Sequence, residues 1–278
     1  MQNIQNEINL VKEKILSFCC ESQNLQDVLK EFLSRKSKLI RSIVAILFLK
    51  SANEIITDEQ YSILAATELI HNASLIHDDA IDENVIRRGK DSINSKFGDK
   101  FSIIAGDYVT TLATQELLKL ANNDVLQIYF ETISKMCEGE SLQYFQKGKI
   151  PTLDEYLKKT QYKTAELFKA CLVASSIYSK NQMLVEAREF AINYGIAFQI
   201  RNDLEDYKRG IDNSSDIQQG IYTAPVIFAD SVENNAFAIE KTMDLIDNYC
   251  QRAKVALLNL SDNDYALSLT ELVNKLCN

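Results

Sequence analysis

The chain has 278 residues, a formal net charge of −9, and only 8 Gly and 2 Pro. Average usage would give roughly 20 Gly and 14 Pro, and the tight turns of β proteins consume these residues. The composition therefore nearly excludes sandwiches, barrels and propellers, disfavours a doubly wound α/β fold, and predicts an all-α protein. The negative balance also argues against a nucleic-acid partner, because such proteins usually present a basic face.

Apolar residues recur at helical spacing along almost the whole chain, which predicts a series of long helices. No linker rich in Pro, Gly or Ser divides them, so we expect one domain over residues 1–278. The helix at 58–82 is apolar on most sides and is expected at the centre of a single bundle of roughly ten or more helices around a cavity. Thr152 and Ser261 are predicted N-caps, and Glu155 completes a capping box with Thr152. The predicted helices cover residues 3–20, 24–33, 38–50, 58–82, 101–121, 124–147, 153–180, 183–209, 222–230, 233–258 and 262–276.

The cysteines, the N-terminal residues and the apolar runs predict where in the cell the protein is located. The six cysteines form no CxxC pair and have no His at metal-ligand spacing, so we expect free thiols in a reducing environment. The N-terminal MQNIQNEINL does not resemble a signal peptide, and the longest apolar run, Ile43 to Leu49, is far too short to span a membrane. These features predict a cytoplasmic protein without a transmembrane segment.

An acidic motif ends the predicted central helix. Asp78 and Asp82 lie four residues apart and therefore share one helix face, with Asp79 beside them. Carboxylates this close repel one another, and a bridging Mg²⁺, which also takes phosphate oxygens, would relieve the repulsion. The alternative is a solvated acidic helix end. Arg87 and Arg88 just downstream favour the magnesium interpretation, because guanidinium groups bind phosphate oxygens.

A second acidic motif lies about 120 residues further along. Gln199, Asp203 and Asp206 fall at positions i, i+4 and i+7 of one helix face, with Asn202 adjacent. Two acidic helix faces can oppose each other across the cavity of a bundle. The two motifs together predict a site in which two or three Mg²⁺ ions hold one diphosphate.

At this point the sequence resembles the trans-isoprenyl diphosphate synthase family, the polyprenyl synthetases of geranylgeranyl or longer-chain type, over nearly its whole length. The DDxxD motif of that family is Asp78 to Asp82, preceded by the pattern from Glu68 to His77. The remaining matches, in chain order, are Arg87-Arg88-Gly89, Phe97-Gly98, Gly106-Asp107, Gly139-Glu140 with Gln143, Lys163-Thr164, Phe198-Gln199 before the second motif, and Asp216 to Pro225.

The resemblance implies an isoprenoid synthase fold and a magnesium-dependent condensation of isopentenyl diphosphate with an allylic diphosphate. It implies a homodimer and weak membrane association for product release. It assigns roles as follows: Asp78, Asp79, Asp82, Lys163 and Asp203 in catalysis; Asp78, Asp82 and Asn202 on the metals; Arg87, Lys163, Thr164 and Gln199 on the allylic diphosphate; Lys38, Arg41, His71 and Arg88 on isopentenyl diphosphate.

The sequence also departs from the family pattern. Of the N-terminal pattern G-G-K-R-x-R-P, only Lys38 and Arg41 remain. Asn202 replaces an aspartate, so we expect the third Mg²⁺ to bind more weakly. The loop after Asp206 lacks the G-K of the family, which leaves Lys208 and Arg209 as candidate replacements.

The chain-length pocket is expected below the first motif. Ala73 and Ser74, five and four residues before Asp78, are small and leave this pocket open, which favours products of C20 or longer. Leu69 or Ile70, one turn further down, forms a floor if its side chain faces the pocket. The alternative is that the small residues serve helix packing alone.

Two other functions remain open on the sequence. A class I terpene cyclase also carries an aspartate-rich motif. Its second motif, however, requires Ser or Thr at the position of Asp206 in this chain and Glu at the position of Gly210. A subunit that stabilises a catalytic partner in a heteromeric synthase would usually have lost the acidic motifs, which this chain retains.

Overall fold

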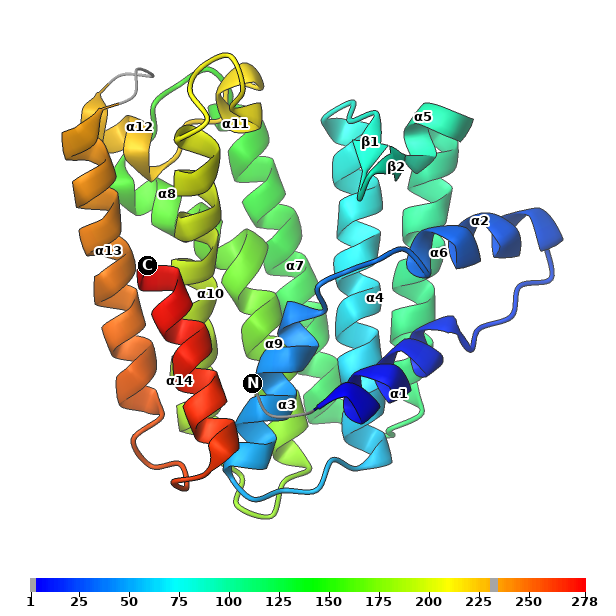
Figure 1. Ribbon diagram of the computed structural model, residues 1–278. Helices are drawn as coiled ribbons and strands as arrows, with labels where there is room; N and C mark the ends of the chain where they lie inside the picture. The colour runs from blue at the N-terminus through cyan, green and yellow to red at the C-terminus, as the bar shows by residue number, and fades with distance from the viewer. Residues whose placement is uncertain (1–3, 231–234) are drawn as a thin grey trace.

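The computed structural model describes residues 4–230 and 235–278, and its architecture is the predicted all-α bundle (Figure 1). Its helices and strands are α1 (Gln5–Leu16), α2 (Gln23–Leu33), α3 (Ile40–Ser51), α4 (Asp58–Ile81), β1 (Ile86–Arg87), β2 (Lys90–Asp91), α5 (Ile93–Phe97), α6 (Asp99–Leu118), α7 (Asn123–Gln146), α8 (Leu153–Thr160), the π-helical segment η1 (Gln161–Ala165), α9 (Glu166–Ile177), α10 (Leu184–Tyr207), α11 (Ser215–Gln218), α12 (Ala224–Ala229), α13 (Ala236–Ala256) and α14 (Asp264–Cys277).

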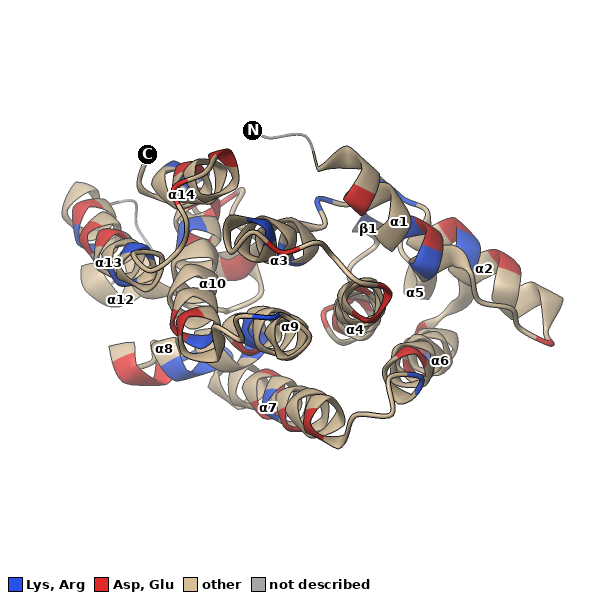
Figure 2. Cartoon of the chain, turned by 90° about the horizontal axis from the view of Figure 1, so that it is seen from below, with Lys and Arg blue, Asp and Glu red and all other residues tan. Residues whose placement is uncertain are grey.

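Helix α4 occupies the centre of one half of the bundle. A capping box between Thr57 and Gln60 fixes its first turn, which satisfies two of the free backbone N–H groups. From below, α4 is surrounded by α1, α3, α6 and α9 (Figure 2). Burial of an apolar side chain such as Ile63 or Leu64, both fully buried, contributes about 1.5–3 kcal/mol. The C-terminal end of α4, which carries the first acidic motif, is therefore held in place by the buried part of the same helix.

The second half of the bundle is built around α10. This helix packs against α9 and α13, and its aromatic residues form a stacked series, with Phe190 against Tyr194 and Tyr194 against Phe198. The C-terminal ends of α4 and α10 lie at the same end of the molecule, at the top in Figure 1. The fold thus brings the two acidic motifs to one end of the bundle.

Several local features differ from the sequence-based expectations. The helix predicted over 153–180 is interrupted by η1, and the short antiparallel ribbon of β1 and β2 was not predicted. Thr152 caps α8 in a capping box with Glu155, as expected. The cap of α14 is Asn263 rather than Ser261, because the Asn263 side chain accepts from two backbone N–H groups at the start of α14. The predicted starts at residues 3 and 233 lie outside the described residues.

None of the helices in the described ranges is both long enough and apolar enough to cross a membrane.

Candidate active site

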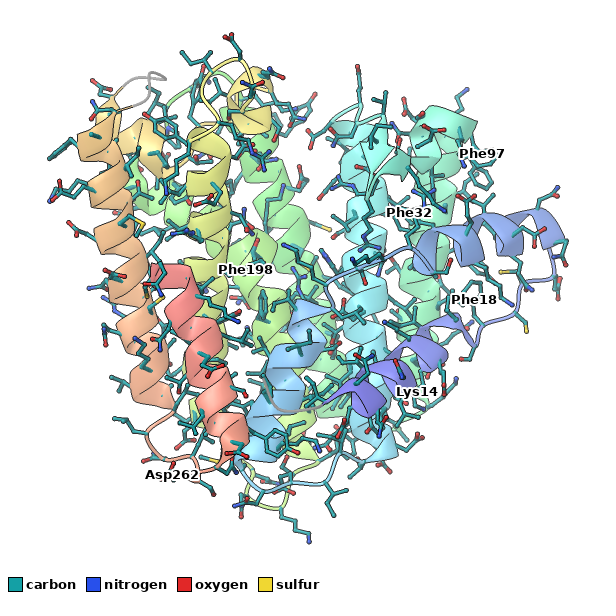
Figure 3. All side chains as sticks on the ribbon, in the orientation of Figure 1. Lys14, Phe18, Phe32, Phe97, Phe198 and Asp262 are labelled. Carbon is teal, nitrogen blue, oxygen red and sulfur yellow. The ribbon has the colours of Figure 1, made fainter. Side chains whose placement is uncertain are left out.

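Residues of both acidic motifs line a polar cavity of about 850 Å³. Its wall comes from the start of α3, the end of α4, the β1 strand, α8 with η1, the C-terminal half of α10, and α11. Phe198, labelled in Figure 3, lines it from α10. The side chains from the sequence-predicted set that line it are Lys38, Arg41, His71, Ser74, Asp78, Asp82, Arg87, Arg88, Lys163, Thr164, Gln199, Asn202 and Asp203.

Asp78 and Asp82 present the first pair of carboxylates to this cavity. Asp82 ends α4 and forms an ion pair of 3.1 Å with Lys147. Burial raises the pKa of Asp78 to about 7, and Lys163 partly opposes that shift. A helix C-terminus is itself unfavourable for negative charge. Two carboxylates in this position suit a hard divalent cation, which takes one or two carboxylates and completes its shell with water and phosphate oxygens.

Asp79 is placed differently from Asp78 and Asp82. Its side chain is buried, with 1% exposed, and it is absent from the cavity wall. Both carboxylate oxygens accept from Nε of Arg87, at 2.9 and 3.1 Å, and the Arg87 Nη2 group donates to the same carboxylate. Asp79 holds Arg87, and it is Arg87 that lines the cavity; the catalytic role expected for Asp79 stays a prediction.

A cluster of basic groups lies between α3 and α4. Arg41 is buried and its guanidinium carbon lies 4.9 Å from the ring centroid of Phe168. Arg88 donates to Asn72 at 3.0 Å and lies 5.9 Å from the ring of Phe32, which Figure 3 labels. These contacts fix two guanidinium groups at one side of the cavity, where they can bind an anion.

His71 and Glu68 complete this basic side. Burial, followed by the charges of Arg41 and Arg88, holds the pKa of His71 well below its ordinary value, so the imidazole is neutral and can donate one hydrogen bond. Glu68 accepts from the backbone N–H of Ser42 at 3.2 Å and from its hydroxyl at 2.9 Å. Burial raises the pKa of Glu68, and Arg41 opposes the shift.

Lys163 and Thr164 are presented by the π-helical segment η1. Gly139 of α7 approaches it on one side, where a Cβ would lie 2.8 Å from Cγ of Lys163. Gly195 of α10 approaches it on the other side, where a Cβ would lie 2.7 Å from Cα of Ala165. The wider π turn, which is frequent at functional sites, thus fits between two helices only because both carry glycine there. Lys163 forms an ion pair with Glu140 of α7.

Replacing Gly195 with Ala is expected to lower the free energy of unfolding by about 1–3 kcal/mol, because the new methyl group meets fixed backbone. In an ordinary helix interior the same change would stabilise by about 0.4–1 kcal/mol. The sign of the effect in urea unfolding is therefore the test. A more stable variant would show that η1 is not clamped. Gly139→Ala should be milder in stability, since the side chain of Lys163 can move.

The second motif forms a hydrogen-bonded series across three elements. The hydroxyl of Thr164 donates to Gln199 at 2.9 Å, and the amide of Gln199 donates to Asp203 at 2.7 Å. Tyr156 of α8 donates to the other oxygen of Asp203 at 2.6 Å. Burial raises the pKa of Asp203. This series fixes Gln199 and Asp203 at the cavity.

Asp206 is withdrawn from the cavity. It accepts from the hydroxyls of Ser214 and Ser215, at 2.5 and 3.1 Å, and from the backbone N–H groups of Ser215 and Asp216. These hydrogen bonds hold the pKa of Asp206 below its ordinary value in spite of burial. Asp206 therefore organises the loop that carries α11.

The two candidate replacement cations after Asp206 are also turned away. Lys208 pairs with Glu205 at 3.4 Å and Arg209 with Asp206 at 3.3 Å, and neither lines the cavity. The expectation that one of them replaces the missing lysine is therefore wrong. Their short loop returns directly to α11 and leaves them facing outward.

The residues present fit divalent cations at the first motif better than at the second. Asn202 lines the cavity with a neutral amide, and Asp203 has both oxygens engaged. Within the described ranges, no three His, Cys, Asp or Glu side chains gather as a metal site. Cations held here would therefore take most of their ligands from water and from a bound diphosphate.

Comparisons with known proteins show the family of this chain. The family model of polyprenyl synthetases matches residues 22–259 of the chain. The chain belongs to the polyprenyl synthetase family. A prenyl transferase of Cyanophora paradoxa is 33% identical over 237 residues, which are 81% of this chain and 73% of that protein. A decaprenyl-diphosphate synthase of Dictyostelium discoideum is 31% identical over 283 residues, 90% of this chain but only 62% of that protein.

Solved structures give the fold of this family member. Heptaprenyl diphosphate synthase from Staphylococcus aureus superposes with a TM-score of 0.89 at 24% identity, covering 99% of this chain and 98% of that one. A geranylgeranyl pyrophosphate synthetase from Pyrococcus horikoshii superposes with a TM-score of 0.87 at 23% identity, covering 99% and 97%. The all-α isoprenoid synthase fold predicted from the sequence is therefore confirmed.

A second, apolar cavity of about 550 Å³ opens beside Asp78 in this polyprenyl synthetase. Helices α4, α6 and α7 line it. Ile70, Ala73 and Ser74 are at its wall, as the sequence analysis expected, whereas Leu69 is not. Leu69 is 2% exposed and packs within the core, which leaves Ile70 as the candidate for a floor. Residues of this cavity that the sequence analysis missed include Thr110, Ile133 and Met136.

The polar cavity of this family member also has a residue that sequence reasoning missed. Lys159 lines it from the last turn of α8. The available signal was its spacing: Lys159 precedes Lys163 by four residues, and residues four apart share a helix face. Asp216 of α11 is a further cavity residue. The sequence indicates it only as part of a family pattern, because its distance in sequence from the first motif conceals their proximity.

Proposed function

We propose that the chain is a magnesium-dependent trans-prenyltransferase. It condenses isopentenyl diphosphate with geranyl, farnesyl or geranylgeranyl diphosphate and releases pyrophosphate. The product is a linear all-trans polyprenyl diphosphate of C20 or longer. The observation that carries this proposal is the junction of two cavities at Asp78 and Ser74: a polar one lined by carboxylates and cations, and an apolar one beneath it.

The residues around the polar cavity divide into two groups by charge. Arg41, His71 and Arg88, with Lys38, hold isopentenyl diphosphate on the side of α3 and α4. Arg87, Lys163, Thr164 and Gln199 hold the allylic diphosphate between the motifs. Neutral His71 donates a hydrogen bond without adding charge to the two neighbouring guanidinium groups.

Asp78 and Asp82 are proposed as the ligands of two Mg²⁺ ions. Mg²⁺ held by these two carboxylates would neutralise the diphosphate and favour ionisation of the allylic C–O bond. Arg87 and Lys163 stabilise the same negative charge as it develops on the leaving group. The apolar cavity keeps water away from the allylic carbocation, and the isopentenyl double bond attacks that carbocation. The released pyrophosphate accepts the proton.

One experiment distinguishes the proposed prenyltransferase from a terpene cyclase. We expect pyrophosphate release from farnesyl diphosphate to depend on added isopentenyl diphosphate. A continuous pyrophosphate assay with each substrate alone and with both together measures this. Release from the allylic diphosphate alone, with a volatile hydrocarbon in the product, would identify a cyclase and overturn the proposal.

Product length is proposed to depend on Ala73, Ser74 and Ile70. Ala73→Phe is expected to fill the upper part of the apolar cavity and to shorten the products by one or more isoprene units. Arg188→Phe is the control, because Arg188 is exposed on α10 and lines neither cavity. Products of unchanged length from Ala73→Phe would remove Ala73 from the substrate path.

We further propose a homodimer of single-domain chains, spanning residues 1–278. Large apolar side chains are exposed on α6 and α7, among them Ile103, Ile104, Leu118 and Phe130, and such surfaces mark interaction sites. Light scattering on the purified chain would give twice the chain mass for a homodimer and the chain mass for a subunit that needs another partner.

A cytoplasmic location with weak membrane association for product release completes the proposal. Its support is that the six cysteines are free thiols in the structure, as is usual in reducing compartments. The reaction product also carries a long apolar tail beside a charged diphosphate.

A further inference from the structure

Lys159 is an unusual cation in the wall of the polar cavity. Its side chain is only 7% exposed, and its ammonium group lies 5.3 Å from the ring centroid of Tyr156 on the previous turn of α8. It faces the cavity together with Lys163, Asp203 and Asp216. A lysine is rarely buried to this degree unless its charge is compensated.

The charge of Lys159 has no direct partner. Within the described ranges, no carboxylate oxygen lies within 4.0 Å of its ammonium group. The other lysines of this cavity differ: Lys163 pairs with Glu140, and Lys36 and Lys38 are exposed to solvent. Asp203 and Asp216 stabilise the charge of Lys159 through space, but neither forms an ion pair with it. A buried ammonium that faces a cavity without a partner points to an anion as its ligand.

The second acidic motif has little charge to offer a divalent cation. The carboxylate of Asp206 accepts hydrogen bonds from serines at the start of α11, and the side chain of Asn202 is neutral. The remaining negative charge on this side of the cavity comes from Asp203 and Asp216. The positive charge of Lys159 interacts with both carboxylates. A further Mg²⁺ here would have to bind beside a fixed positive charge, with few free carboxylate oxygens to offset the repulsion.

We propose that Lys159 binds the substrate diphosphate at the second acidic motif and supplies there the positive charge that a third divalent cation would otherwise supply. Pyrophosphate then binds with two Mg²⁺ ions, both at Asp78 and Asp82. The inference rests on the proposed function, since it assumes that the cavity holds a diphosphate. It gives the second motif a different composition from the first: a lysine and hydrogen-bond donors in place of a metal cluster.

The test is calorimetric binding of inorganic pyrophosphate to the full chain over a range of Mg²⁺ concentrations. For the unaltered chain, we expect the logarithm of the affinity to rise with the logarithm of free Mg²⁺ at a slope near two. Lys159→Met keeps the apolar stem over Tyr156 and removes the charge. It is expected to weaken binding by about 10- to 100-fold at fixed Mg²⁺, the loss expected for one charged hydrogen bond.

Matched variants separate binding from structure. Lys158→Met removes the same charge from the exposed neighbouring position on α8 and should bind as the unaltered chain does. Lys159→Arg keeps the charge and should retain most of the affinity, even if Lys159→Met folds poorly. Lys159→Met combined with Asn202→Asp should regain affinity and shift the slope toward three, an effect that a merely structural lysine would not produce.

The outcomes distinguish two failures. No binding of pyrophosphate by the unaltered chain at any Mg²⁺ concentration would overturn the proposed function. Normal Mg²⁺-dependent binding with a slope of three, or equal affinities for Lys159→Met and Lys158→Met, would overturn the role of Lys159 and leave the proposed function standing.

Discussion

Asp78→Asn is expected to reduce turnover by about a thousandfold or more while the protein remains folded. The carboxylate faces the cavity at the end of α4, and a metal ligand contributes several kcal/mol to charge stabilisation in the transition state. Burial already raises the pKa of Asp78 to about 7, so the metal-free protein gains nothing from its negative charge. The thermal midpoint should therefore be unchanged or higher.

The measurement is turnover and thermal unfolding on the same preparation, with Glu83→Gln as control. Glu83 follows the motif directly and is exposed, so its loss should alter neither quantity. Substantial turnover in Asp78→Asn, at saturating Mg²⁺, would contradict the assignment of Asp78 as a ligand.

Asp79→Asn is expected to give the opposite pattern, with a large loss of stability. Its carboxylate is buried and binds Arg87 through both oxygens. Removing one partner of a buried ion pair costs about 3–5 kcal/mol, and the partly exposed Arg87 side chain places the expected value at the lower end of that range. Activity should fall through weaker allylic diphosphate binding, which raises KM for that substrate more than it lowers kcat.

A double-mutant cycle tests this assignment. Once Arg87→Met is present, Asp79→Asn should cost little further stability, because the two residues interact directly. Asp91→Asn, at an exposed position of the nearby ribbon, should change stability by less than about 0.5 kcal/mol. Additive losses for Asp79 and Arg87 in urea unfolding would refute the proposed anchoring.

The helices of this fold were predictable because their signals are local. The apolar spacing of α4 and α10 extends over six turns, and the Thr152 capping box lies within four residues. Local signals of this kind survive in any tertiary context that buries the apolar face. The meeting of the two acidic motifs was also predictable, since both end long helices of one bundle.

The departures arise where the tertiary structure decides. Asp78 and Asp79 are neighbours in sequence, but the helix turns them to different sides, and only the position of Arg87 shows which one is anchored. The π turn at Lys163 depends on glycines from two other helices. Asp206 has the correct spacing for the cavity face, yet the serines of the following loop bind it first.

The most direct test of the proposed activity is chain-length analysis of the products formed from labelled isopentenyl diphosphate and farnesyl diphosphate, with and without Mg²⁺. We predict linear polyprenyl diphosphates of C20 or longer that form only when Mg²⁺ is present. Absence of any elongated product at high Mg²⁺, from a protein that is folded and dimeric, would contradict the account.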